Sequence, residues 1–521
     1  MSAGQPAVFE TPRDALAAGM LIAFTAAHSP EHPAILSDRG DLTFGELNAR
    51  ANQLARALRA RGLAEGDAVA LMCSNRPEFA EVYAACLRAG LRMTCLNFHL
   101  QADEAGYIVD DCEARAFIAE GDRVAEVAHA AAAAAPKASV RLTIGKDIPG
   151  FESYQDSLAP ESGVDLSDPV RGGTMLYTSG TTGRPKGVYR REIPAPETAT
   201  TPSREPMVRD ESAVLCTGPL YHAAPLQTNL HVPLQRGITV VLMDRWDAED
   251  SLRLIEKHRV THTHMVATMF HRLLALPQDV KDRYDISSLR YVLHGAAPTP
   301  VHIKQAMMDW LGPKLFEYYA ATEGGGTFIS PEQWLEKPGS VGPPNPGRVV
   351  EILDDDGRNL GVGEIGTVYF NRPEQGAFEY FKDAEKTASA YRGDRFTLGD
   401  HGYLDEDGYL FLTGRTSELI ISAGVNIYPA EVDAVLLMHP SVADAACVGV
   451  PNEERGEEVK AVVQLALGLE PSEALAAELI AFCRDRLASF KCPRSVDFDP
   501  TLPRGDAGKV QRNKVRARYW S

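Results

Sequence analysis

Amphipathic and apolar segments alternate along this chain, and this alternation limits the folds open to it. Apolar residues recur at helical spacing from Leu42 to Arg61, and the apolar run Ala68–Met72 that follows has the length of a buried strand. The same order returns at Pro77–Ala89 before Met93–Leu96, and at Asp247–Lys257 before Val260–Val266. Repeated helix and strand units predict an α/β fold with mainly parallel sheets.

The length and a change of pattern predict two domains. A chain of 521 residues is too long for one compact core. After Arg415 the segments shorten, with helices expected at Pro429–Met438 and Ser472–Leu487 and strands at Ala443–Val450 and Val459–Leu467. We predict a large N-terminal domain of layered sheets with helices over residues 1–414, a hinge at 415–417, and a small α+β domain over 418–521. The Ala-rich segment Val124–Ala135 is expected to be a plain surface helix.

Composition excludes several classes of protein. The net charge of −18 argues against a general nucleic-acid or anionic-membrane surface, although a local basic patch can still receive an anionic cofactor such as coenzyme A. Eight cysteines without a CxxC pair indicate a reduced, cytoplasmic protein. The N-terminus has no basic start followed by an apolar stretch, so we expect no secretory signal. No apolar run near eighteen residues is present, so we expect no transmembrane segment and at most peripheral membrane contact.

The run from Tyr177 to Gly187 is the segment that most clearly indicates a binding function. It holds four Ser/Thr hydroxyls, three glycines and Lys186 after an apolar strand. Glycines let backbone N–H groups approach phosphate oxygens, while hydroxyls and a lysine add donors and positive charge. The Walker A pattern of kinases and GTPases does not match, because Pro185 precedes the lysine and Gly187 follows it. The run therefore predicts a loop that binds polyphosphate but is not of the Walker A type.

This run resembles the phosphate loop of the acyl-adenylate-forming superfamily, which contains acyl-CoA synthetases, adenylation domains and luciferases. Further matching segments follow in the family's order: Gly295–Pro298, Tyr319–Glu323, Gly339–Gly342, Gly363–Gly366, Gly399–Asp400, Gly414–Arg415, Gly424–Glu431 and Gly508–Lys509. The resemblance covers nearly the full chain. It implies activation of a carboxylic acid with ATP and Mg²⁺, then transfer of the acyl group to coenzyme A.

The resemblance also assigns roles to residues of the nucleotide site. The phosphate contacts fall to Thr178, Ser179, Gly180, Thr181, Thr182, Gly183 and Lys186. The adenine contacts fall to Gly295, Ala296, Ala297 and Tyr319, and the ribose contacts to Asp400 and Arg415. Thr322 and Glu323 take the α-phosphate, with Glu323 also holding the metal. No tightly bound organic cofactor is expected.

The remaining roles concern chemistry and domain rotation. Lys509 is expected to bridge the α-phosphate and the acyl carboxylate in the first half-reaction. Ala423 and Gly424 are expected to line the pantetheine tunnel in the second, after the small domain rotates. His222 matches a family position between the acyl pocket and the nucleotide, where gating and a structural role remain equal alternatives.

The chain departs from the family pattern at several positions. Ser417 stands at the usual pivot, with the acidic Glu418 next to it, and Ala320 replaces a common glycine. Gly505 and Ala507 stand in the lysine loop where hydroxyl residues are frequent, which loosens that loop. We expect adenylation to survive, and a weakened first half-reaction is the alternative.

An AMP-forming acyl-CoA synthetase is the leading hypothesis for function. The alternatives are an adenylation enzyme that loads a separate carrier protein, a thioesterifying enzyme with weak adenylation, a non-catalytic nucleotide-binding protein and a luciferase-like oxygenase. The Met-containing strand near Met265 and the run from His294 to Ala297 favour a fatty, terpenoid or steroid acid over an aromatic one. Relatives of this kind are often dimers, so a homodimer is possible.

Overall fold

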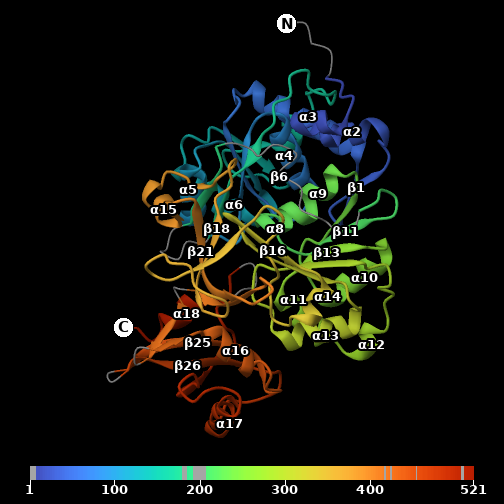
Figure 1. Cartoon of the computed structure of the whole chain (residues 1–521). Coiled ribbons are helices and arrows are strands. Elements are labelled where there is room, and N and C mark those ends of the chain that lie inside the picture. Colours follow the sequence, from blue (N-terminus) through green and yellow to red (C-terminus); the bar gives the residue numbers. More distant parts are fainter. Residues whose placement is uncertain are drawn as a thin grey trace. The chain divides into compact units, whose positions relative to one another are not determined.

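A computed structural model describes residues 7–178, 185–191, 207–415, 418–422, 425–452, 455–505 and 510–520 (Figure 1). These residues divide into two compact units. The first comprises Met1–Met265, Ala275–Leu293 and Pro373–Thr387, and the second comprises Val266–Leu274, His294–Arg372 and Ala388–Ser521.

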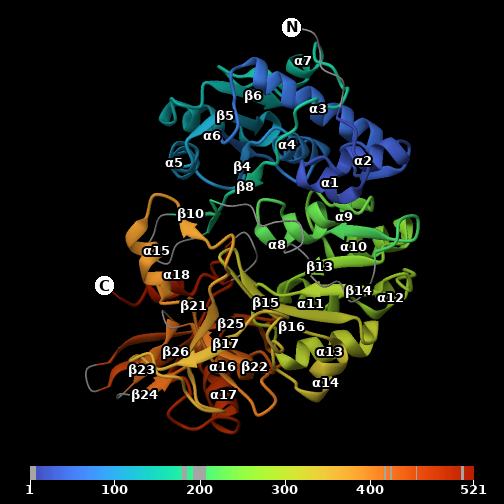
Figure 2. The ribbon, with the colours of Figure 1, turned by 45° about the horizontal axis from the view of Figure 1, so that its top comes forward.

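The first unit contains a six-stranded parallel sheet in the order β7-β6-β5-β3-β4-β8. Its strands are β3 (Ala68–Met72), β4 (Arg92–Leu96), β5 (Ala114–Glu120), β6 (Val140–Ile144), β7 (Glu152–Ser153) and β8 (Gly173–Thr174). The accompanying helices are α1 (Pro12–Ala17), α2 (Leu21–His28), α3 (Phe44–Ala60), α4 (Pro77–Arg88), α5 (Ala102–Asp111), α6 (Gly121–Ala134) and α7 (Tyr154–Leu158). Helices lie on both faces of this sheet (Figure 2).

Alternation along β3 explains this layering. Val69 and Leu71 point into a core that also contains Leu54 of α3 and Val82 of α4. Neighbouring side chains of a strand point to opposite faces. Met72 accordingly belongs to a second core on the other face, together with side chains of α5 and α6. All five residues of β3 are buried, which confirms the predicted buried strand.

The first unit also contributes six neighbouring strands to an eight-stranded sheet, in the order β14-β13-β11-β12-β1-β2. These strands are β1 (Pro33–Leu36), β2 (Leu42–Thr43), β11 (Ala213–Cys216), β12 (Thr239–Leu242), β13 (His262–Met265) and β14 (Tyr291–His294). The nearby helices are α8 (Ala223–Pro225), the π-helix η2 (Leu226–His231), α9 (Val232–Gln235), α10 (Ala248–His258) and α12 (Gln278–Lys281). β1, β11, β12 and β13 pair in parallel, while β2 is antiparallel to β1.

A third, antiparallel sheet in the first unit has the order β19-β10-β9. It is formed by β9 (Leu176–Thr178), β10 (Lys186–Tyr189) and β19 (Glu379–Tyr380), and α15 (Ala384–Ala390) follows β19.

The second unit contains antiparallel hairpins and the predicted small domain. Its helices are α11 (Ala267–Leu274), α13 (Val301–Leu311), α14 (Pro331–Glu336), α16 (Pro429–Leu436), α17 (Glu473–Arg484) and α18 (Arg512–Arg516). Its strands are β15 (Leu315–Ala321), β16 (Gly324–Ile329), β17 (Val350–Leu353), β18 (Gly366–Asn371), β20 (Tyr391–Arg392), β21 (Arg395–Leu404), β22 (Leu410–Arg415), β23 (Ile420–Ser422), β24 (Val425–Ile427), β25 (Val442–Asn452), β26 (Gly456–Leu465) and β27 (Ser495–Phe498). β17, β18, β20, β21 and β22 form one sheet, and β23 to β27 form another.

Helix α6 differs from its prediction as a plain surface helix. Val124, Ala128 and Ala131 are buried in the second core of the six-stranded sheet. A Cβ atom added at Gly106 of α5 would lie 2.9 Å from the Cβ atom of Ala134. The small side chains therefore allow α5 and α6 to pack closely, which helix propensity alone does not reveal.

No helix among the described residues is long and apolar enough to cross a membrane. The eight cysteines are free and buried.

A buried histidine predicts a loss of stability in acid. His264 in β13 is 2% exposed, and burial lowers its pKa to about 4. Between about pH 6.5 and pH 4 the unfolded chain binds the proton and the folded chain does not, so stability falls as the pH falls through this window. We expect His264→Asn to flatten this pH dependence in urea unfolding. His99→Asn, at an exposed position, is the control and should leave the slope unchanged. If the free energy of unfolding had the same slope against pH in His264→Asn and in the native protein, the prediction would be contradicted.

Candidate active site

The two ends of the predicted phosphate loop meet in the β9–β10 hairpin. Thr178 pairs directly with Lys186, and Gly187 with Tyr177. The amine of Lys186 lies 5.7 Å from the centre of the Tyr380 ring. Desolvation and the charge of Lys386 lower the pKa of Lys186. The predicted loop residues Ser179, Gly180, Thr181, Thr182 and Gly183 lie outside the described residues.

Three residues predicted to bind the nucleotide, Tyr319, Asp400 and Arg415, lie in contact in the second unit. The register of β21 and β22 places Arg415 directly opposite Asp400, and Arg415 Nε donates to Asp400 Oδ1 at 3.1 Å. The hydroxyl of Tyr319 donates to Asp400 Oδ2 at 2.6 Å. Burial and the nearby Asp400 carboxylate raise the pKa of Tyr319 well above its usual value. A carboxylate has about four acceptor positions. Asp400 therefore has capacity to accept from further hydroxyl groups.

The turn after β14 packs backbone to backbone against β15. A Cβ atom added at Gly295 would lie 2.6 Å from the carbonyl oxygen of Tyr318, so only glycine fits there. Ala296 has a φ of +67°, a left-handed conformation that is strained for an L-residue. Strain of this kind clusters at ligand sites. The segment Gly295–Ala297 thus begins in close contact with the strand that carries Tyr319.

Thr322 and Glu323 form the connection between β15 and β16. Ala321 pairs with Gly324, which places the two polar residues at the tip of the hairpin. Both side chains are half-buried. The β15–β16 hairpin therefore carries Tyr319 and the Thr322–Glu323 pair on one short element.

His222 precedes helix α8 in the first unit, and its ring lies 4.7 Å from the ring of Tyr221. The π-helix η2 begins four residues later. Helices of this type are rare and often occur at functional sites. The geometry is compatible with both roles considered for His222.

Other predicted residues cannot be placed. Lys509, Ala423, Gly424, Ser417 and Ala507 lie outside the described residues. Of the other departures from the family pattern, Ala320 is half-buried in β15, and Gly505 is also half-buried. Glu418, which keeps the usual acidic character at its position, accepts from Arg512 Nε at 3.1 Å.

A magnesium ion fits the donors only if the nucleotide supplies most ligands. Among the described ranges, no group of three or more His, Cys, Asp or Glu side chains is arranged to hold a metal. Mg²⁺ commonly takes one or two protein carboxylates together with substrate phosphates and water. Glu323 provides a single half-buried carboxylate of this kind.

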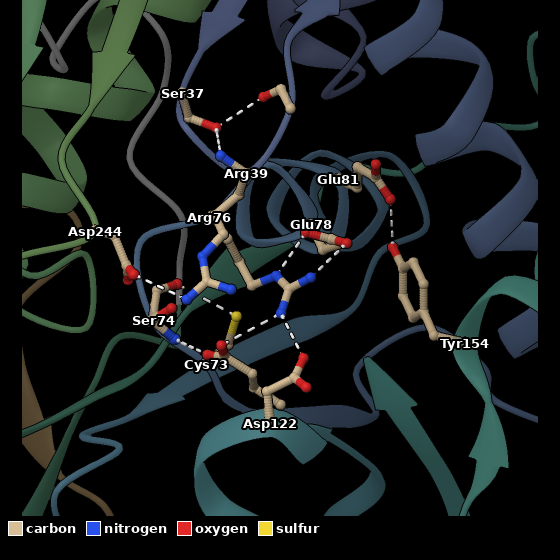
Figure 3. Close-up of polar contacts among 12 residues, drawn as sticks. Ser37, Arg39, Cys73, Ser74, Arg76, Glu78, Glu81, Asp122, Tyr154 and Asp244 are labelled. Atoms are coloured by element: carbon tan, nitrogen blue, oxygen red, sulfur yellow. Dashed lines mark hydrogen bonds and ion pairs between the residues drawn. The ribbon is translucent and has the colours of Figure 1, made fainter. Parts of the chain in front are cut away.

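A second position where a ligand could bind, at one edge of the six-stranded sheet, is occupied by side chains of the protein. In parallel sheets, ligands often bind where the strand order reverses, which here is between β3 and β5. Arg76, after β3, contacts Glu78 at 2.7 Å and Glu120, at the end of β5, at 3.3 Å. Arg123 contacts Glu120 at 3.4 Å and also pairs with Asp244. Figure 3 shows Arg76 beside Glu78, and Asp244 beside Arg39, which it contacts at 3.0 Å. These ion pairs indicate a structural role for the crevice.

Removal of Arg76 is therefore expected to destabilise the protein. Glu120 is fully buried and pairs with both Arg76 and Arg123, so loss of Arg76 removes part of the compensation for this buried charge. We expect Arg76→Met to lower the free energy of unfolding by about 3 kcal/mol in urea titrations. Lys137→Met is the control, because its pair with Glu113 is 62% and 44% exposed. Similar small losses in both variants would contradict the structural role.

Comparison with known proteins identifies the family of this chain. Residues 22–380 match the model of the AMP-binding enzyme family, and residues 431–509 match that of the AMP-binding enzyme C-terminal domain. The chain belongs to the AMP-binding enzyme family. This confirms the resemblance, the α/β fold class with a C-terminal domain, and the enzyme class of acid–thiol ligases.

Relatives of the chain are similar over almost their whole length. A fatty acid–[acyl-carrier-protein] ligase, ScoC, of Streptomyces coeruleorubidus is 32% identical, covering 95% of each chain. The long-chain-fatty-acid–CoA ligase FadD13 of Mycobacterium tuberculosis is 31% identical, covering 96% of this chain and 98% of the relative. The anthranilate CoA ligase AuaEII, solved with anthranoyl-AMP, has a TM-score of 0.86 at 26% identity, covering 96% of this chain and 97% of that one.

Sequence reasoning missed the buried ionic side chains near the site. Lys304, Glu317 and His294 are all less than 7% exposed and lie beside the predicted adenine segments. In the sequence His294 reads only as part of an apolar run, and no local pattern pairs Lys304 with Glu317 because the two residues lie on different elements.

Proposed function

We propose that this chain is an AMP-forming acyl-CoA synthetase for a fatty or bulky apolar carboxylic acid, with a role in lipid metabolism. Membership of the family supports ATP and coenzyme A as substrates. The observation that carries the nucleotide site is the Tyr319–Asp400–Arg415 contact, because it leaves a fixed carboxylate able to accept the two ribose hydroxyls.

In the first half-reaction, a carboxylate oxygen of the acid attacks the α-phosphorus of ATP. A new O–P bond forms while the bond to pyrophosphate breaks, and pyrophosphate leaves. The acid needs no general base, because it is ionised at neutral pH. We assign Thr178, Lys186 and the residues between them to the β- and γ-phosphates. Thr322 and Lys509 take the α-phosphate, where fixed positive charge and donors stabilise the transition state.

The base and ribose have their own contacts in this proposal. Tyr319 lies against adenine, with the Gly295–Ala297 turn on the other side. Asp400 accepts from the ribose hydroxyls beside Arg415. Glu323 would hold Mg²⁺, which would neutralise phosphate charge and so favour the departure of pyrophosphate.

In the second half-reaction, the thiolate of coenzyme A attacks the acyl carbon, a C–S bond forms, and AMP leaves with the electron pair of the broken C–O bond. Ala423 and Gly424 line the path of the pantetheine arm, and rotation at the hinge 415–417 brings them to the adenylate. His222 acts as a gate between the acyl and nucleotide sites. We also propose that the protein is cytoplasmic and forms a homodimer, and that any contact with a membrane is peripheral.

The identity of the thiol acceptor has one competing candidate. ScoC, which resembles the chain over 95% of its length, is named as a ligase for an acyl carrier protein. A separate carrier protein is therefore the second candidate acceptor.

Both the acid and the acceptor can be identified in one set of assays. The protein is incubated with ATP, Mg²⁺ and acids graded in length and bulk, with either coenzyme A or a pantetheinylated carrier protein, and products are measured by mass spectrometry. We expect CoA thioesters, formed fastest from fatty or bulky apolar acids. Thioester on the carrier alone supports the second candidate, and a clear preference for small aromatic acids contradicts the proposed substrate class.

A further inference from the structure

Three ionisable side chains are buried together in the second unit. Lys304 of α13 donates from Nζ to Glu317 Oε2 of β15 at 2.7 Å. Nε2 of His294, at the end of β14, lies 3.7 Å from the same oxygen. Lys304 and His294 have no exposed surface, and Glu317 is 6% exposed. The Lys304 amine also lies 4.8 Å from the ring centre of the buried Trp334. This ionic cluster is thus enclosed by protein.

Stability alone does not account for such a cluster. Burial lowers the pKa of Lys304 and raises the pKa of Glu317, while each partner's charge opposes the shift. A buried ion pair often stabilises no better than apolar side chains of similar volume, but it fixes how its elements meet. The cluster therefore specifies an arrangement of α13, β14 and β15.

That arrangement includes both predicted adenine segments. His294 directly precedes Gly295, whose backbone touches Tyr318 so closely that a Cβ atom would lie 2.6 Å from its carbonyl oxygen. Glu317 directly precedes Tyr318 in β15 and lies two residues before Tyr319, which contacts Asp400. The ionic cluster is therefore joined by one or two peptide links to each segment that would contact the base.

We propose that Lys304, Glu317 and His294 form a positioning network that holds the Gly295–Ala297 turn against Tyr318 and Tyr319 and thereby sets the affinity for the adenosine part of the nucleotide. The network acts through these segments and does not contact the reacting atoms. It rests on the proposed nucleotide site.

AMP binding measured by calorimetry tests the network without turnover. We compare Lys304→Met, Glu317→Gln and the double variant, each well below its unfolding temperature, and record unfolding in urea for all three. Each single variant is expected to bind AMP at least about tenfold more weakly, while the KM for the acid changes less than about twofold. Arg358→Met is the control, because its pair with Asp356 is 76% and 69% exposed.

The double variant separates positioning from stability. It leaves no unpaired charge, so the urea midpoint lost in the single variants should largely return. If the network positions the turn, AMP affinity stays low in the double variant. Recovery of AMP affinity together with stability would overturn the proposal, as would native AMP affinity in folded single variants. Absence of acid-dependent pyrophosphate release from the native protein would instead contradict the proposed function, since AMP binding requires no turnover.

Discussion

Replacing Lys509 with alanine is expected to lower acid-dependent pyrophosphate release by on the order of 10³-fold, comparable to the loss of one donor to a developing charge. The family pattern Gly508–Lys509 assigns this lysine to the α-phosphate and the acyl carboxylate, where negative charge gathers in the first half-reaction. The rate is measured by ATP–pyrophosphate exchange with the best acid.

The second half-reaction provides the internal control for Lys509→Ala. Thioester formation from supplied acyl-adenylate and coenzyme A should stay near the native rate, because in the proposed mechanism this lysine withdraws before that step. Lys514→Ala, at an exposed position in α18, should affect neither reaction. Unchanged pyrophosphate release in Lys509→Ala would show that Lys509 is not used. The first half-reaction would then be weak, and the loosening of the lysine loop by Gly505 and Ala507 would explain why.

Replacing Asp400 with alanine is expected to weaken AMP binding by on the order of 10³-fold. A hydrogen bond to a charged group contributes about 1.5–3 kcal/mol, and the proposed contact with ribose has two. The change also removes the shared acceptor of Tyr319 and Arg415, so neither side chain keeps its fixed position. AMP affinity is measured by calorimetry on the folded variant.

A neighbouring acidic residue controls for charge in the Asp400→Ala experiment. Asp394, exposed just before β21, is replaced by alanine in the same assay and should leave AMP affinity within about twofold. A 2′,3′-dideoxy nucleotide adds a second check. Because it lacks both hydroxyls, Asp400→Ala should weaken its binding by less than it weakens the binding of AMP. Native AMP affinity in Asp400→Ala would rule out the ribose contact.

Local patterns predicted the regular elements well. The helix expected from Leu42 to Arg61 is α3, which begins at Phe44 because Thr43 and Glu46 form a capping box. Apolar spacing on that helix identified buried positions such as Leu47 and Leu54. The domain boundary at 415–417 stays a prediction.

Contacts between distant segments were harder to predict. The Ala-rich helix α6 has a buried face because Gly106 of α5 approaches it, and Gly106 lies outside the helix itself. Segment matches indicated Tyr319, Asp400 and Arg415 one at a time, but their contacts depend on strand register and on pairing across the fold. The Lys304–Glu317 pair joins α13 to β15, and no periodic pattern in the sequence predicts it.

The most direct test of the account is the fate of ATP in the presence of an acid. The native protein is incubated with ATP, Mg²⁺, coenzyme A and the panel of acids, and all phosphate products are quantified. Acid-dependent formation of AMP, pyrophosphate and CoA thioester in equal amounts is the predicted result. ADP and inorganic phosphate as products, or no acid-dependent product from any acid, would contradict an AMP-forming acyl-CoA synthetase.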